Sequence, residues 1–140
     1  MFFKRILVPV DGSKHALLAK RKAMGIAVSM NAEIILVNVL DNIPAIIGGH
    51  AREEIRDEQR DEAEKIFTQY RPELEEHGVK YSTRVAIGRP FDAICEVAEE
   101  EGCDLICLGA RGLNEVEGML LGSVSSDIIS HCKTPVLIVR

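Results

Sequence analysis

Short apolar runs alternate with longer, partly polar segments along the whole chain. The clearest run is residues 34–37, four consecutive apolar residues that lie between two segments of helical periodicity. A strand that is apolar on both faces is typical of a parallel sheet, because helices cover both sides of such a sheet. The alternation therefore predicts an α/β chain in which helices connect parallel strands.

The pattern predicts five strands and four helices in strict alternation, within one domain spanning residues 1–140. Strands are expected at residues 6–10, 33–40, 79–85, 104–110 and 135–139. Helices are expected at residues 14–30, 51–77, 90–102 and in a short segment through Ser126 and Ile129. Because residues 79–85 alternate apolar and polar side chains, that strand should have one exposed face or lie at an edge of the sheet. Pro72 is expected to kink the second helix or to break it into two pieces.

The charge of the chain argues against one class of partner. The 140 residues include 17 Lys and Arg against 22 Asp and Glu, a net charge of -5. Residues 51–77 account for all of this excess, and the rest of the chain is balanced. Nucleic-acid-binding proteins usually carry excess Lys and Arg, so no nucleic-acid partner is expected. A single small anion could still bind to the balanced part of the chain.

The same inspection predicts a cytoplasmic protein with no membrane partner. The apolar stretch in residues 1–10 is interrupted by Lys4, Arg5 and Pro9, and no apolar run approaches the ~18 residues needed to cross a bilayer. The four cysteines lack the spacing of a zinc site, and Cys107 is expected in the core.

Two strand ends are rich in glycine and small polar residues. Asp11-Gly12-Ser13 follows the first strand, residues 109–112 follow the fourth, and Gly122-Ser123 opens the last helix. Ligands of open parallel sheets bind beyond the carboxyl ends of the strands, where the strand order reverses. Glycine backbone and a helix N-terminus together suit a phosphate group. The pattern therefore indicates a phosphate site, with ordinary turns, and a helix-capping role for Asp11, as the alternatives.

The spacing of these glycines resembles that of a known family. Gly109-x-x-Gly112, followed by nine residues and Gly122-Ser123, is similar to the G-x2-G-x9-G-[S/T] nucleotide signature of the universal stress protein family. The opening residues 6–13, residues 38–41 after the second strand, and the terminal residues 134–139 agree with the same family. The resemblance extends over the whole chain.

The resemblance implies a Rossmann-like open parallel sheet of order 3-2-1-4-5, with helices on both faces and an ATP site at its centre. Asp11 would bind the ribose hydroxyls, Val39 would meet the adenine edge, and Pro9 and Val10 would line the base pocket. The phosphates would receive backbone N–H groups from Gly109, Gly112, Gly122, Ser123 and Val124, and hydroxyl groups from Ser123 and Ser125. Arg111 occupies a variable position of the signature, and its phosphate contact is a hypothesis drawn from its charge. ATP, ADP or AMP is the expected ligand, accompanied by Mg²⁺ whose protein ligands are not assigned.

Three functions are compatible with this resemblance. The first is an ATP-binding regulatory protein of the stress response, a homodimer through the uncharged edge strand Val136, Leu137, Ile138 and Val139. In this protein nucleotide occupancy would change the conformation or the partners. The second is a slow ATPase or phosphoryl-transfer enzyme, which the absence of a G-x-x-x-x-G-K-[ST] motif disfavours. The third is an interaction module with an empty pocket, and the intact glycine motif counts against it.

Overall fold

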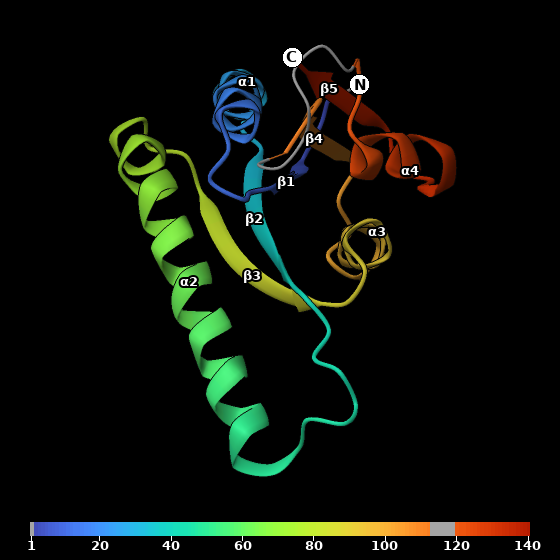
Figure 1. Cartoon of the computed structure of the whole chain (residues 1–140). Coiled ribbons are helices and arrows are strands. Elements are labelled where there is room, and N and C mark those ends of the chain that lie inside the picture. The colour runs from blue at the N-terminus through green and yellow to red at the C-terminus, as the bar shows by residue number, and fades with distance from the viewer. Residues whose placement is uncertain (1, 113–119) are drawn as a thin grey trace.

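The computed structural model describes residues 2–112 and 120–140, and its parallel strands form one sheet of order β3-β2-β1-β4-β5 (Figure 1). The strands are β1 (Arg5–Pro9), β2 (Glu33–Leu40), β3 (Tyr81–Ile87), β4 (Leu105–Gly109) and β5 (Val136–Val139). The helices are α1 (Lys14–Met30), α2 (Gly49–Glu76), α3 (Pro90–Glu100) and α4 (Ser123–His131). The predicted α/β class, the strand order and the edge position of β3 are confirmed. The middle of the expected loop between Gly109 and Gly122 lies outside the described residues.

The sheet lies between two helical layers, with α1 and α2 on one face and α3 and α4 on the other (Figure 1). In β1, Ile6 and Val8 pack toward α1 and α2, whereas Leu7 packs toward α3 and α4. All three side chains are fully buried. Successive side chains of a strand point to opposite faces, so the covered middle of β1 needs apolar residues at each of its three positions.

Helix α2 runs through Pro72 without a break, so of the two predicted outcomes, a kink or a break into two pieces, the break is wrong. Proline removes one helical hydrogen bond, and packing on either side offsets that loss. Phe67 before the proline and Leu74 after it are both buried against the sheet. Tertiary contacts on both sides of Pro72 thus support an unbroken helix.

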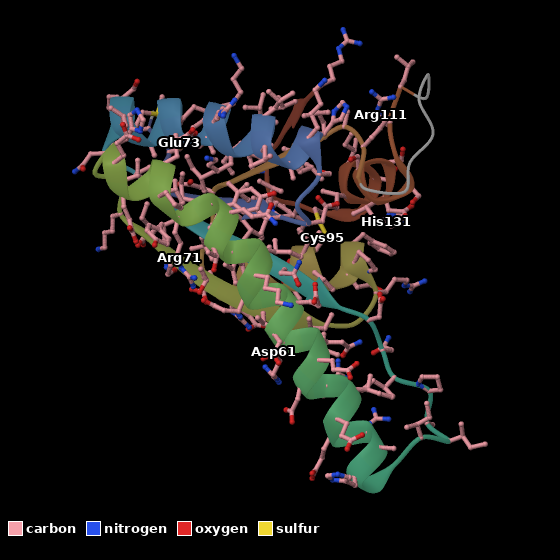
Figure 2. All side chains as sticks on the ribbon, turned by 60° about the vertical axis from the view of Figure 1, so that its left-hand side comes forward. Asp61, Arg71, Glu73, Cys95, Arg111 and His131 are labelled. Atoms are coloured by element: carbon pink, nitrogen blue, oxygen red, sulfur yellow. A yellow bond between two sulfur atoms is a disulfide. The ribbon has the colours of Figure 1, made fainter. Side chains whose placement is uncertain are left out.

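A disulfide joins Cys95 of α3 to Cys132, the residue that ends α4 (Figure 2). The sequence pattern did not indicate this disulfide, because the two cysteines are 37 residues apart and only the packing of α3 beside α4 brings them together. Cys103 and Cys107 are free and buried. The Cys107 thiol donates to the Ala19 carbonyl, and burial raises its pKa to about 12, so Cys107 is the core residue that was expected.

In the part of the chain that the structure describes, no helix is long and apolar enough to cross a membrane.

Candidate functional site

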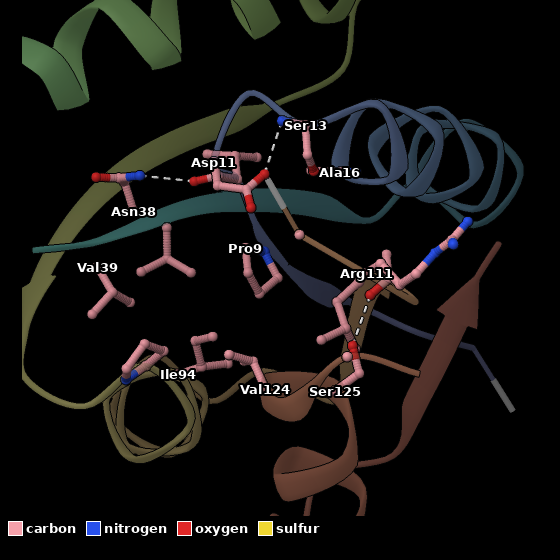
Figure 3. Close-up of a pocket in the computed structure, with 17 residues that line it drawn as sticks. Pro9, Asp11, Ser13, Ala16, Asn38, Val39, Ile94, Arg111, Val124 and Ser125 are labelled. Atoms are coloured by element: carbon pink, nitrogen blue, oxygen red, sulfur yellow. Dashed lines mark hydrogen bonds between the residues drawn. The ribbon is translucent and has the colours of Figure 1, made fainter. Parts of the chain in front are cut away.

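A pocket opens beyond the carboxyl ends of β1 and β4, which are neighbours in the sheet (Figure 3). Its empty volume, including the solvent at its mouth, is about 730 Å³. Most of the predicted site residues line it, namely Pro9, Val10, Asp11, Val39, Gly109, Arg111, Gly112, Gly122, Val124 and Ser125. Ser123 stands apart, because it is the exposed first residue of α4.

One side of the pocket is apolar and includes residues that the motifs did not reveal. Ile94 and Pro90 come from α3, and Val37 and Asn38 come from β2 beside the predicted Val39. In the sequence, Ile94 belongs to the apolar positions of α3, and nothing in that pattern distinguishes a pocket wall from ordinary core. Apolar walls of this kind suit a flat ring system rather than a charged group.

Asp11 lies at the rim of the pocket, held by its own loop. Its Oδ1 accepts a hydrogen bond of 2.9 Å from the Ser13 backbone N–H. Ser13 is the N-cap residue of α1, because its Oγ accepts from the Ala16 N–H at 3.2 Å. Ser13, and not Asp11, therefore caps α1, and Asp11 holds the backbone of that cap residue. The second carboxylate oxygen of Asp11, Oδ2, faces the glycine loop after β4.

Gly112 passes close to this carboxylate. A Cβ atom at position 112 would lie 2.9 Å from Oδ2 of Asp11, closer than such atoms come without a shift. The side-chain-free residue therefore lets the loop and the carboxylate share one edge of the pocket. A carboxylate accepts hydrogen bonds from hydroxyl groups, so a ligand with hydroxyl groups could bind at this edge of the pocket.

Gly109 is constrained by packing rather than by the pocket. A Cβ atom there would lie 2.6 Å from the Cβ of His15 and 2.8 Å from its carbonyl oxygen. The first turn of α1 thus packs directly on the end of β4, where only glycine leaves enough room. The residue lines the pocket, but its identity follows from the helix contact.

The N-terminus of α4 opens onto the same pocket. Gly122 is its N-cap residue, and glycine has no side chain that could accept from the first-turn amides. The backbone N–H groups of Val124 and Ser125 belong to the first turn, where an α-helix supplies no partner. Such amides, together with the partial positive charge of the helix end, favour an anion.

Two of the predicted phosphate donors already serve the fold. The Gly122 N–H donates to the Ala110 carbonyl at 2.7 Å. The Ser125 hydroxyl donates to the Gly109 carbonyl at 2.8 Å, and the side chain is buried (Figure 3). Both bonds tie the start of α4 to the end of β4, so an anion would meet the first-turn amides before these groups.

Arg111 is the positive side chain of the pocket, and it runs from the glycine loop toward α1 (Figure 3). Its Nη2 lies 2.9 Å from Nε2 of His15, which accepts because a guanidinium has only donors. A direct contact with a phosphate would need the guanidinium to leave this position.

No group of three or more His, Cys, Asp and Glu side chains that could hold a metal ion occurs among the residues described by the structure.

Comparison with known proteins gives consistent results over the whole chain. The profile of the Universal stress protein family matches residues 2–140. Universal stress protein MJ0531 of Methanocaldococcus jannaschii is 35% identical over 141 residues, covering 99% of this chain and 82% of that protein. The structure of MJ0577 from the same organism has a TM-score of 0.89 at 30% identity, covering 99% of this chain and 96% of that one. A universal stress protein solved in complex with cAMP has a TM-score of 0.79 at 29% identity, covering 100% of this chain and 99% of its own.

Proposed function

The chain belongs to the universal stress protein family, and we propose on that premise that it is an ATP-binding regulatory protein of the stress response. One observation carries the proposal most directly: the N-terminus of α4, which begins after Gly122, and the Asp11 carboxylate border the same pocket. A helix N-terminus suits phosphates, and a carboxylate suits ribose hydroxyls. The relative in complex with cAMP supports a nucleotide as the ligand class. We expect this protein to act in the cytoplasm as one domain.

The proposed pose places the base against the apolar side of the pocket. Pro9, Val10 and Val39 would surround adenine, and Asp11 would accept hydrogen bonds from the ribose hydroxyls. The phosphates would lie along the glycine loop and the start of α4, near Gly112, Val124 and Ser125. Gly109, Gly122 and Ser123 would contribute at the edges of this path, and Arg111 would reach a terminal phosphate after leaving His15. Mg²⁺ would be carried mainly by the phosphates, as it usually is in nucleotide sites.

The lining of the pocket favours binding over hydrolysis. Asp11 and Arg111 are the ionisable side chains among the described residues that line it. The proposed pose assigns Asp11 to the ribose rather than to the phosphates, so it is a poor candidate for a general base. A slow ATPase remains the alternative, and it would need a group to position the attacking water.

Calorimetry with ATP, ADP and AMP, each with and without Mg²⁺, tests the proposal. We expect saturable binding, together with turnover far below the ~1 per second of slow typical enzymes. Product formation would be followed by chromatography in the same samples. Absence of binding at roughly millimolar nucleotide would overturn the proposed function, and rapid turnover would favour the enzymatic alternative.

We further propose a homodimer that forms through β5. This strand ends the sheet and pairs only with β4 among the described strands. The carbonyl groups of Pro135 and Val139 accept from β4, so the backbone groups of Val136 and Ile138 point to the open edge. An uncharged open edge of this kind favours pairing with another strand. Light scattering at micromolar concentration should give twice the chain mass, and a monomer would contradict the proposal.

A further inference from the structure

Both peptide groups that flank Asp11 are held by side chains from other elements. On one side, Nδ2 of Asn38 in β2 donates to the Val10 carbonyl at 2.8 Å (Figure 3). On the other side, the Gly12 N–H donates to the hydroxyl oxygen of Tyr70 in α2 at 3.1 Å. Asn38 and Tyr70 are both buried, and Tyr70 has no exposed surface. The backbone direction at Asp11 is therefore set from two sides.

Tyr70 is itself rigidly placed. The ring belongs to the core beneath α1 and α2, and the Lys20 ammonium lies 5.9 Å from its centre. Lys20 is buried and forms an ion pair of 2.8 Å with Glu73, one turn along α2 from Tyr70. Burial raises the pKa of Tyr70 to about 12, so the phenol stays neutral at physiological pH. A fixed, neutral hydroxyl oxygen is thus presented to the loop.

The loop needs this support because of its conformation. Gly12 has a φ of +81°, in the region that favours glycine. A glycine loop has many alternative conformations, and each of them would turn the Asp11–Gly12 peptide and with it the carboxylate. The bond to Tyr70 selects the conformation in which Asp11 Oδ2 faces the pocket edge next to Gly112.

We infer that Tyr70 is a positioning residue for nucleotide selectivity, which holds Asp11 in the orientation that reads the ribose 2′-hydroxyl. The inference rests on the proposed function, and it extends the site to α2, a helix that does not line the pocket. A phenylalanine would fill the same space in the core. The hydroxyl group is therefore the part of Tyr70 that serves the loop.

The test compares ATP with 2′-deoxyATP in the wild-type protein and in Tyr70→Phe by calorimetry. Loss of one neutral hydrogen bond should weaken ATP binding by about two- to tenfold, whereas binding of 2′-deoxyATP, which offers Asp11 only its 3′-hydroxyl, should weaken less. The preference for ATP would therefore fall toward one. Tyr81→Phe is the matched control, because the Tyr81 hydroxyl donates to Glu75 on the surface and should leave the preference unchanged.

A second measurement needs no nucleotide. Amide hydrogen exchange at Gly12, followed by NMR, should be faster in Tyr70→Phe than in the wild type, while core amides of β1 keep their protection. Unchanged exchange at Gly12 would overturn the inference directly.

The outcomes separate the two proposals. Wild-type protein that binds neither nucleotide contradicts the proposed function and removes the basis of the inference. Wild-type protein that prefers ATP, together with a Tyr70→Phe variant that keeps the full preference, overturns the role of Tyr70 alone. Equal binding of ATP and 2′-deoxyATP by the wild type would also overturn it, because Asp11 would then not read the 2′-hydroxyl.

Discussion

Opening the Cys95–Cys132 disulfide should destabilise the chain by an amount that follows from its position. The two cysteines are 37 residues apart, and the chain-entropy relation for a loop of that length gives about 4 kcal/mol at 25 °C. For 140 residues the entropy of unfolding is about 0.3 kcal/mol/K, so the melting temperature should fall by about 13 °C. The bond also joins two helices that line the pocket, so its loss should weaken nucleotide binding.

Urea unfolding of the wild type, with and without a phosphine reductant, measures the effect. The matched control is the double variant Cys95→Ala, Cys132→Ala, which should have the stability of the reduced wild type and show no response to reductant. Thiol titration in denaturant should find two reactive groups before reduction, Cys103 and Cys107, and four after it. Four reactive thiols in the untreated protein, or an unfolding curve that reductant does not move, would refute the reasoning.

Three further predictions concern the site, the sheet edge and the contact between α1 and α2. Gly112→Ala should weaken ATP binding by about five- to hundredfold, because its Cβ would meet Asp11 Oδ2. Gly25→Ala is the control, since the space around Gly25 is open and ATP affinity should not change. Equal ATP affinities of the Gly112→Ala variant and the wild type in calorimetry would contradict the prediction. Leu137→Lys should give a monomer in light scattering, because a charge at the edge of β5 opposes strand pairing, while Val28→Lys, on the exposed side of α1, should leave the dimer intact. The Glu73 carboxyl has a pKa held below its usual value of 4.5, chiefly by its hydrogen bond with Lys20. The native state therefore gains stability from Glu73 above about pH 4.5 and loses it as the pH falls further. In urea unfolding at several pH values, the advantage of the wild type over Glu73→Gln should shrink below pH 4.5, and a constant difference down to pH 3 would speak against the ion pair.

The strand order was predicted from the resemblance to the family, whereas the residues themselves indicated only which strands are buried on both faces and which are partly exposed. Residues 34–37 are apolar without interruption, and β2 lies inside the sheet, whereas the alternation in residues 79–85 matches the edge position of β3. The predicted break at Pro72 was wrong, because it considered only the helical hydrogen bond that a proline removes. Burial of Phe67 and Leu74 on either side of it could be known only once the helix lay on the sheet.

Some residues of the candidate site could be predicted from the sequence, and others could not. Loops that directly follow β1 and β4 were brought together in the prediction, because neighbouring parallel strands end at the same edge. Ile94, Asn38 and Tyr70 reach the pocket or its loop from α3, β2 and α2, and their local patterns are those of ordinary core residues. Only the packing of these elements reveals that Tyr70 meets Gly12 across a separation of 58 residues.

Two glycines of the signature are constrained by different contacts, and only one of these contacts concerns the proposed nucleotide site. Gly109 is required by the approach of His15, which would exclude a side chain whether or not a nucleotide binds. Gly112 is required by Asp11, whose carboxylate belongs to the proposed ribose site. Substituting Gly109 with alanine should lower the free energy of unfolding by about 1–3 kcal/mol with or without ATP, whereas the Gly112 substitution should act mainly on affinity. A match at the first glycine is thus evidence for the packing of α1 on β4. The second glycine, together with the start of α4 at the pocket, carries the argument for a nucleotide.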